Sequence, residues 1–273
     1  MKVIIDSDIG DDITDAFALG FALKSKLNIQ AILSNNNHEI SRAKIIHKLV
    51  GKNKIPVFAG IHKGKSRLTN QKEFVKNYNH KIKNIKDNLS FFKKLFRQKI
   101  YYISLGTLSN VDFFLKNIPN FEKNVKIIMT GGSIKKDYHG KNRKRTEWNI
   151  SCDIKSAQNV FRSNLKITMF TLDTTWNLTL DDKYINRFKE SPNSLNQNLF
   201  NLHKIWKKTH RRQVIQYDSP VIAYLLDKKI ATLKQLKLAI NDKGHVVKGN
   251  KKVEVATNIN KTRFKNIFLK TIL

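Results

Sequence analysis

Cysteine and long apolar runs are nearly absent from this sequence. Cys152 is the only cysteine in 273 residues, which excludes an intramolecular disulfide and any zinc site built from several cysteines. No apolar run approaches the roughly 18 to 20 residues that span a bilayer, and the early run "VII" is shorter than the apolar core of a signal peptide. We therefore expect a cytoplasmic protein with no membrane partner, in which Cys152 is an ordinary core or surface residue.

Acidic residues are also scarce. The chain has 21 Asp and Glu against 52 Lys and Arg, a formal net charge of +31. Such a surface attracts phosphate groups without sequence preference. However, the lysines are scattered over the predicted loops and solvent faces, and the only dense cluster is "GKNRKR" at 140–145. Lysine exceeds arginine and Asn and Ile are abundant, as A/T-rich coding would produce. We interpret the charge as compositional drift and do not expect a nucleic-acid partner.

Short apolar segments alternate with segments of helical periodicity. They are "KVIID" and a helix at 13–24, "NIQAILS" and a helix at 38–51, "PVFA", "IYYISLG" and a helix at 109–117, "VKIIMTGG" and a helix at 153–163, and "KITMFTL". Apolar strands without polar alternation are typical of parallel sheets covered on both faces. The sequence therefore predicts a single α/β domain over 1–273, with a doubly wound, mostly parallel sheet and helices on both faces.

Three further segments complete the predicted fold. Residues 61–99 are lysine-rich with helical stretches, and 183–212 have helical periodicity, so both are predicted to be insertions around strand ends. The C-terminal segment is predicted to form a short β-hairpin, with turns at 242–244 and 249–250, followed by a closing helix.

The stretch "DSDIGDDITDA" follows the first predicted strand and holds five aspartates: Asp6, Asp8, Asp11, Asp12 and Asp15. In doubly wound sheets, ligands bind beyond the carboxyl ends of the strands. One or two of these aspartates could cap the helix at 13–24, but capping does not explain five. Carboxylates this close repel one another unless they are neutralised, and a hard divalent cation is the usual solution. The stretch therefore predicts a metal site.

Five segments, in order from residue 3 to residue 227, resemble the inosine-uridine-preferring nucleoside hydrolases. "VIIDSDIGDDITDAFAL" resembles the N-terminal aspartate motif of that family, and "SLGTLSNV" resembles its Gly-x-Leu-Thr-Asn turn. "IIMTGGS" with "TEWNISCDIKSAQNVF" resembles its Gly-Gly strand end and Glu-aromatic-Asn segment. "ITMFTLDTTWNLTL" resembles the next strand and loop, and "QYDSPVIAYLLD" resembles the closing His-Asp-Pro helix.

The resemblance implies a Ca²⁺-dependent N-ribohydrolase that cleaves a ribonucleoside into ribose and free base. It implies that Asp8 is both a Ca²⁺ ligand and the general base, and that the other Ca²⁺ ligands are Asp15, Asp218 and the carbonyl of Leu105. The residues implied to bind the ribose hydroxyls are Asn35, Glu147 and Asn149. The expected partner is a small-molecule ribonucleoside, and a homo-oligomer, either dimer or tetramer, is compatible with the resemblance.

These residue types suit the implied reaction. Cleavage of a glycosidic bond passes through an oxocarbenium-like transition state, whose positive charge carboxylates and amide oxygens stabilise. A bound Ca²⁺ can hold a water and lower its pKa, while a ligand carboxylate accepts the proton.

The chain departs from the family in three places. The family's adjacent Asp pair becomes Thr14 and Asp15 when it is counted back from the helix, whereas counting from the strand gives Asp12 and Ile13. In the first register Asp12 either serves the turn or swings in to replace the carboxylate missing at Thr14. Tyr217 replaces a His implicated in leaving-group protonation, and "HKGKSRLTN" replaces a glycine-rich loop. The metal site therefore looks kept, while the ribose-diol and leaving-group sites are altered.

Several of these residues also have ordinary structural interpretations. Asn35 could belong to a simple strand-to-helix turn, Glu147 and Asn149 alternate as on an exposed strand edge, and Asp218 could cap a helix. Base specificity is open: Trp148, Trp176, Trp206 and Tyr217 could stack on a base, and His210 could protonate one.

Two other functions remain open. One is a degenerate family member that binds Ca²⁺ or a nucleoside-like ligand without efficient turnover, an alternative favoured by Thr14 and Tyr217. The other is a basic nucleic-acid-binding protein. A magnesium phosphatase with an Asp-x-Asp loop is disfavoured, because that loop needs Gly-Thr after the second Asp and "DIGDD" lacks it.

Overall fold

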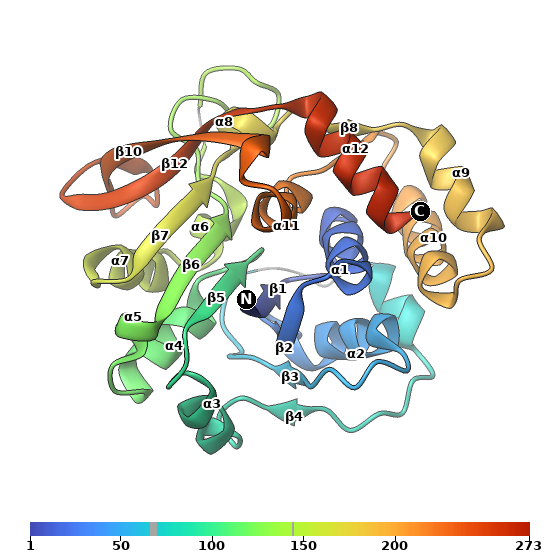
Figure 1. Ribbon diagram of the computed structural model, residues 1–273, viewed down its shortest axis with the longest axis horizontal. Helices are drawn as coiled ribbons and strands as arrows, with labels where there is room; N and C mark the ends of the chain where they lie inside the picture. Colours follow the sequence, from blue (N-terminus) through green and yellow to red (C-terminus); the bar gives the residue numbers. More distant parts are fainter. Residues whose placement is uncertain (66–69, 144) are drawn as a thin grey trace.

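The computed structural model describes residues 1–65, 70–143 and 145–273 (Figure 1). The strands of its main sheet are β1 (Lys2–Ser7), β2 (Asn28–Ser34), β3 (Val57–Ala59), β4 (Lys83–Asn84), β5 (Ile100–Ser104), β6 (Val125–Thr130), β7 (Lys166–Phe170), β10 (Ala231–Ile240), β11 (Val246–Lys248) and β12 (Lys251–Ile259). Their order is β11-β10-β12-β7-β6-β5-β1-β2-β3-β4. All pairings are parallel except those of β10 with β11 and β12, which confirms the predicted mostly parallel sheet.

The order in which the chain adds strands reverses at the centre of the sheet. From β1 the chain first builds outward through β2, β3 and β4, then returns to place β5 on the other side of β1 and builds outward through β6 and β7. The carboxyl ends of β1 and β5 therefore flank the point where the strand order switches, which is where doubly wound folds form their binding crevice.

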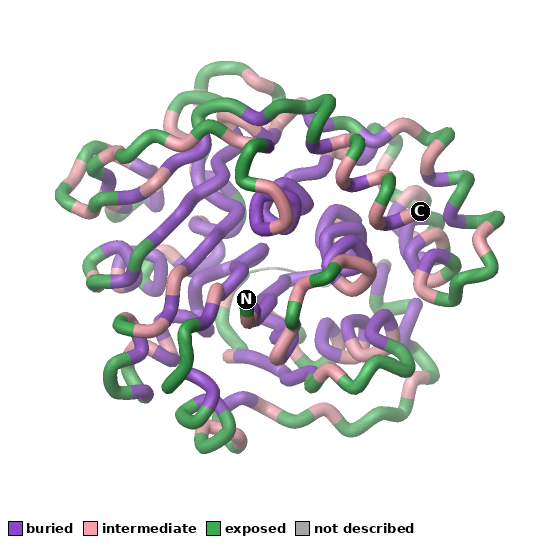
Figure 2. Tube along the Cα trace, viewed as in Figure 1, coloured by how far each residue is buried: buried purple, intermediate pink, exposed green. Residues whose placement is uncertain are grey.

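Helices cover both faces of the sheet, as predicted (Figure 1). They are α1 (Thr14–Lys24), α2 (Glu39–Val50), α3 (Leu89–Leu95), α4 (Ser109–Asn117), α5 (Phe121–Asn124), α6 (Trp148–Cys152), α7 (Ile154–Arg162), α8 (Leu172–Thr175), α9 (Asp182–Glu190), α10 (Ser194–Lys207), α11 (Ser219–Leu226) and α12 (Lys261–Ile272). Along β1, Val3 and Ile5 join one apolar core with α1, α2 and α10, while Ile4 joins the other with α3, α4 and α7. The central strands are therefore buried on both sides (Figure 2).

Two peripheral regions differ from the sequence-based expectation. Within 61–99, the described residues form a 3₁₀ helix (Asn70–Val75), the edge strand β4 and α3, so this region extends the sheet and is not only an insertion; part of the "HKGKSRLTN" loop lies outside the described residues. The predicted C-terminal hairpin is too short. The long strand β10 pairs mainly with β12, and β12 in turn pairs with β7 of the main sheet. The turns at 242–244 and 249–250 are present on either side of β11, and α12 is the predicted closing helix.

The region at 183–212 forms α9 and α10, as predicted. The strand before it, β8 (Thr179–Leu180), and the strand after it, β9 (Val214–Ile215), form a small antiparallel pair. In the described segments of the chain, no helix combines the length and the apolar character needed to cross a membrane. Lys144, within the basic cluster, lies outside the described residues.

Candidate active site

A cavity of about 790 Å³ opens at the carboxyl ends of the central strands. Asp8 follows β1, Leu105 follows β5, Thr130 ends β6 and Gly131 follows it; all four line the cavity. Seven of the chain's 21 acidic residues also line it: Asp8, Asp11, Asp12, Asp15, Asp137, Glu147 and Asp218. A protein with a net charge of +31 thus concentrates a third of its carboxylates in one crevice.

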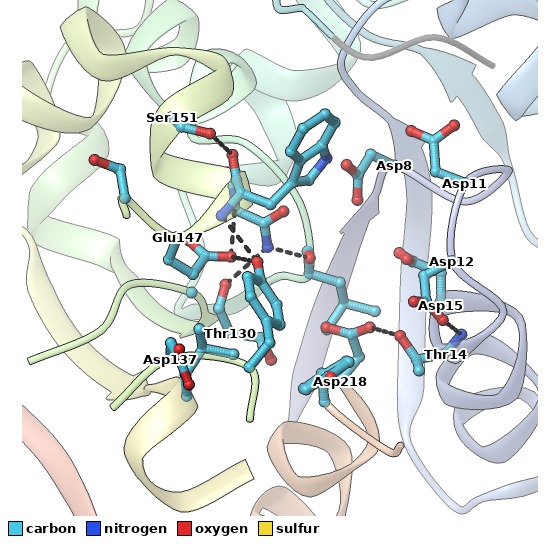
Figure 3. A pocket seen from close by; sticks show the side chains of 18 of the residues that line it. Asp8, Asp11, Asp12, Thr14, Asp15, Thr130, Asp137, Glu147, Ser151 and Asp218 are labelled. Atoms are coloured by element: carbon cyan, nitrogen blue, oxygen red, sulfur yellow. Dashed lines mark hydrogen bonds between the residues drawn. The ribbon is translucent and has the colours of Figure 1, made fainter. Parts of the chain in front are cut away.

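Asp8, Asp15 and Asp218 form one wall of this cavity (Figure 3). All three are buried, and α1 begins at Thr14, which puts Asp15 in its first turn. The Ser7 hydroxyl donates to Asp15 Oδ1 at 2.6 Å, and the Thr14 hydroxyl donates to Asp218 Oδ2 at 2.5 Å. The helix-side register therefore brings a carboxylate to the other two, whereas Ile13 of the strand-side register is buried apolar core.

Burial, together with neighbouring carboxylates, raises the pKa values of these three side chains. Burial raises the pKa of Asp8 to about 6, against the opposing charge of Arg42. Burial, followed by the charges of Asp218 and Asp8, raises the pKa of Asp15 well above its usual range. Burial does the same to Asp218, partly offset by the Thr14 hydrogen bond and reinforced by the charge of Asp8. A positive charge bound beside these three carboxylates would therefore stabilise their ionised forms.

The predicted Ca²⁺ site stays a prediction. In the described part of the chain, no group of three or more His, Cys, Asp or Glu side chains is arranged as a metal cluster. Instead, hydroxyl groups hold oxygens of Asp15 and Asp218. Leu105, whose carbonyl is the other predicted ligand, lines the cavity, and that carbonyl accepts a hydrogen bond from Asn149 Nδ2 at 2.8 Å. Every predicted ligand is nonetheless an oxygen donor, as a hard cation requires.

Asp12 lines the cavity, but its side chain accepts hydrogen bonds from backbone N–H groups at the start of α1. Its Oδ1 accepts from the backbone N–H groups of Ile13 at 2.7 Å and Thr14 at 3.3 Å, and its Oδ2 pairs with Arg212. Asp12 therefore does not occupy the place of the carboxylate missing at Thr14. The neighbouring Asp11 pairs with the fully buried Arg42 at 2.9 Å.

Asp6 lies behind the cavity and is not part of its lining. Its carboxylate is fully buried and accepts from Tyr102 Oη at 2.5 Å, Asn35 Nδ2 at 2.8 Å and Asn110 Nδ2 at 2.9 Å. Burial raises the pKa of Asp6 to about 7 despite these donors. Asp6 thus ties together β1, β5, α4 and the turn after β2. In the sequence, only its place as the last residue of the predicted strand "KVIID" separates Asp6 from the other four aspartates.

Asn35, predicted to bind ribose, is fully buried and is not among the residues that line the cavity. Its amide donates to Asp6 and accepts from the Thr107 backbone N–H at 3.2 Å. The adjacent Asn36 is the amide that reaches the acidic wall, donating to Asp8 Oδ2 at 3.2 Å. Gly106 permits this close packing, since a Cβ there would lie 2.4 Å from Asn35 Oδ1 and 2.8 Å from Asp8 Oδ1.

Glu147 lies on the opposite wall (Figure 3). Asn149, two residues later in α6, lines the same cavity, so the exposed-strand interpretation of both residues is wrong. Glu147 is the N-cap of α6, where its carboxylate accepts from the backbone N–H groups of Asn149 and Ile150. It also accepts from the Gly132 N–H at 2.8 Å, at a glycine with φ of 72°. Both side chains are buried, and burial raises the pKa of Glu147 against its backbone donors.

Asp218 precedes α11, but its side chain makes no capping hydrogen bond. The bond from Thr14 takes that place, so the capping interpretation of Asp218 is wrong.

Three of the five candidate base-contacting side chains line the cavity: Trp148, His210 and Tyr217. Trp148 is 45% exposed at the start of α6, and Tyr217 packs edge-on against Tyr138, with ring centroids 5.6 Å apart. Burial raises the pKa of Tyr217 to about 12, so it is a neutral hydroxyl where the family usually has His. The other two candidates, Trp176 and the fully buried Trp206, are not among the lining residues.

The family model for inosine-uridine preferring nucleoside hydrolases matches residues 3–266. The chain belongs to this family. A probable ribonucleoside hydrolase of Dictyostelium discoideum is 24% identical over 199 residues, covering 64% of this chain and 58% of that protein. A non-specific ribonucleoside hydrolase of Salmonella paratyphi A is 27% identical over 158 residues, covering 56% and 50%. The chain thus spans little more than half the length of these curated relatives.

Solved structures of family members share the fold. A plant nucleoside hydrolase superposes with a TM-score of 0.84 at 21% identity, covering 99% of this chain and 98% of its own. A purine-preferring ribonucleoside hydrolase from Gardnerella vaginalis gives a TM-score of 0.82 at 20% identity, covering 100% and 98%. At these identities the likeness establishes the doubly wound fold.

Proposed function

We propose that this chain is a ribonucleoside hydrolase that cleaves the N-glycosidic bond to release ribose and a free base. The observation that carries the proposal is the concentration of carboxylates in the cavity at the strand-order switch of a nucleoside hydrolase fold. The two relatives above are named ribonucleoside hydrolases, which supports the same reaction class.

The two walls suit the two demands of this reaction. As the glycosidic bond breaks, positive charge grows on the sugar, and the surrounding carboxylates stabilise it. Glu147 and Asn149 are rigidly held by backbone partners, so they can orient the ribose hydroxyls without rearranging. Asp8, on the opposite wall, is the carboxylate we assign to accept the proton of the attacking water.

We propose Ca²⁺ as the cofactor, held by Asp8, Asp15, Asp218 and the carbonyl of Leu105. The fit lies in the donor set: three buried carboxylates, with burial and neighbouring negative charges raising the pKa values of Asp15 and Asp218, together with Leu105 on the same cavity. When bound, such a cation supplies a coordinated water of lowered pKa.

One contact favours the degenerate-member alternative. Thr14 stands where the helix-side register expects a ribose-binding carboxylate, and its hydroxyl is directed at Asp218. A chain that has lost the diol acceptor could keep a cation or a nucleoside-like ligand without turning it over.

A ribose-release assay separates these functions. The purified protein is incubated with inosine, uridine, cytidine or adenosine, with added Ca²⁺ or with chelator, and free ribose is measured. The hydrolase proposal expects ribose from at least one nucleoside, lost with chelator and in Asp8→Asn. Ca²⁺ binding without ribose release would establish the degenerate alternative, and chelator-resistant release would contradict the cofactor proposal alone.

A further inference from the structure

A cationic side chain stands within the acid-lined cavity. Arg212 lies between α10 and β9 and lines the cavity, together with Asp12 and Tyr217. Its guanidinium pairs with Asp12 Oδ2 and lies near the Tyr217 hydroxyl, whose pKa it lowers against the stronger effect of burial. Arg212 thus brings positive charge to the site where the family's His would stand.

The guanidinium of Arg212 is held from two sides. Its central carbon lies 5.4 Å from the ring centroid of Trp206, a buried indole that also stacks on His210 at 4.7 Å. Asp12, on its other side, is fixed by the backbone N–H groups of Ile13 and Thr14. A planar, permanently charged fork placed in this way is preorganised, so few degrees of freedom are lost when it binds a ligand.

The charge of the cavity makes such a cation valuable in the reaction. When the glycosidic bond breaks, both bonding electrons go to the base, which becomes negatively charged. Seven carboxylates line the cavity and disfavour that anion. Tyr217 is neutral and offers only a hydroxyl at the position of the family's His. A guanidinium can hydrogen-bond the leaving base with charge assistance.

We propose that Arg212, positioned by Asp12, contacts the base of the substrate and stabilises its negative charge as the glycosidic bond breaks. The inference rests on the proposed hydrolase function. The C1′–N bond breaks, the water oxygen bonds to C1′, and the water's proton leaves through Asp8 to solvent. The base then takes a proton from solvent.

The same contact has a consequence for specificity. A guanidinium has hydrogen-bond donors and no acceptor, so it pairs with the carbonyl that hypoxanthine carries at C6 and uracil at C4, where adenine and cytosine carry an amino group instead. Arg212 should therefore favour hypoxanthine and uracil over adenine and cytosine as leaving groups.

The test compares substrates whose leaving groups differ in their need for stabilisation. Inosine is compared with 4-nitrophenyl β-D-ribofuranoside, whose nitrophenolate is already a stable anion. Arg212→Gln should lower kcat/KM for inosine roughly ten- to hundredfold, as loss of a charge-assisted hydrogen bond does, and lower it less than about threefold for the nitrophenyl riboside. Asp12→Asn keeps the oxygen that caps α1 but loses the charge that holds Arg212. It should therefore lower kcat/KM for the two substrates in the same pattern, by smaller factors.

The matched control is Arg211→Gln, an equal loss of charge at the exposed neighbour that is not among the cavity-lining residues; it should behave as wild type. Equal loss on both substrates in Arg212→Gln, or no loss on inosine, would overturn the inference while the hydrolase function stood. If wild type cleaves neither substrate, the hydrolase function fails. The affinity for inosine, measured by calorimetry, then tests whether Arg212 contacts the base. Arg212→Gln should then bind inosine roughly tenfold more weakly than Arg211→Gln, and equal affinities would overturn it.

Discussion

Thr14→Asp restores the missing carboxylate of the family motif and so perturbs the acidic wall directly. In the native chain the Thr14 hydroxyl donates to Asp218 Oδ2 at 2.5 Å, with both side chains buried. The substitution removes that donor and places a second carboxylate beside Asp218. Two full charges about 4 Å apart interact by roughly 4 kcal/mol at an effective dielectric constant near 20, and protonation of one of them relieves part of this.

We therefore expect Thr14→Asp to lower the free energy of unfolding by about 2 to 4 kcal/mol in chelator at neutral pH. For a domain of this size that corresponds to a fall in Tm of roughly 5 to 15 °C. The new carboxyl has a folded-state pKa above its unfolded value near 4, so the penalty is small at pH 4 and grows as the pH rises through that value. Added Ca²⁺ should raise the Tm of the variant more than that of wild type, because the charge of the bound cation relieves the repulsion between the new carboxylate and Asp218 in the folded state.

Thermal unfolding in chelator and in millimolar Ca²⁺, at pH 4 and pH 8, measures the loss of stability, its pH dependence and the stabilisation by Ca²⁺. Thr14→Ser keeps the hydroxyl and should melt close to wild type, whereas Thr14→Val loses only the donor and should cost about 1 to 3 kcal/mol. With Ca²⁺ present, a restored diol acceptor should also raise kcat/KM for a ribonucleoside roughly ten- to hundredfold. A Thr14→Asp protein with the wild-type Tm in chelator would refute the proposed coupling between Thr14 and Asp218.

Four other expectations follow from the same structure. Asp218→Ala should sharply weaken Ca²⁺ binding measured by calorimetry, and wild-type affinity would remove Asp218 from the ligand set. Gly106→Ala should lower both Tm and ribose release, because its Cβ would lie 2.8 Å from Asp8 Oδ1; an unchanged protein would contradict that packing. Burial lowers the pKa of His203, so stability to urea should fall as the pH drops below about 6.5, and His203→Gln should flatten that dependence. Duplex DNA should bind weakly, with affinity falling steeply between about 50 and 200 mM salt, and submicromolar, salt-resistant binding would make the charge a recognition surface.

Local sequence patterns determined the fold class and the position of the site. Apolar strand segments alternating with helical periodicity predict a doubly wound sheet, because each pattern reports the burial of its own element. The aspartates after the first strand predict an acidic site at the carboxyl edge, and the cavity lies there. The C-terminal hairpin was underestimated, since the pairing of β10 with β12 joins residues separated by a whole strand and two turns.

Only the tertiary structure decided which polar groups meet. Asp6 is drawn away from the cavity by donors on three other elements, and Glu147 is a helix cap on a buried wall. The ion pair of Asp12 with Arg212 joins residues 200 positions apart in the chain. Such contacts depend on how strand ends, loops and helices are brought together, and a periodicity of 2 or 3.6 residues carries no record of a partner so distant. Local patterns thus placed the carboxylates at one edge of the sheet, and long-range packing sorted them into those that face the cavity, those that cap helices and those that tie the elements together.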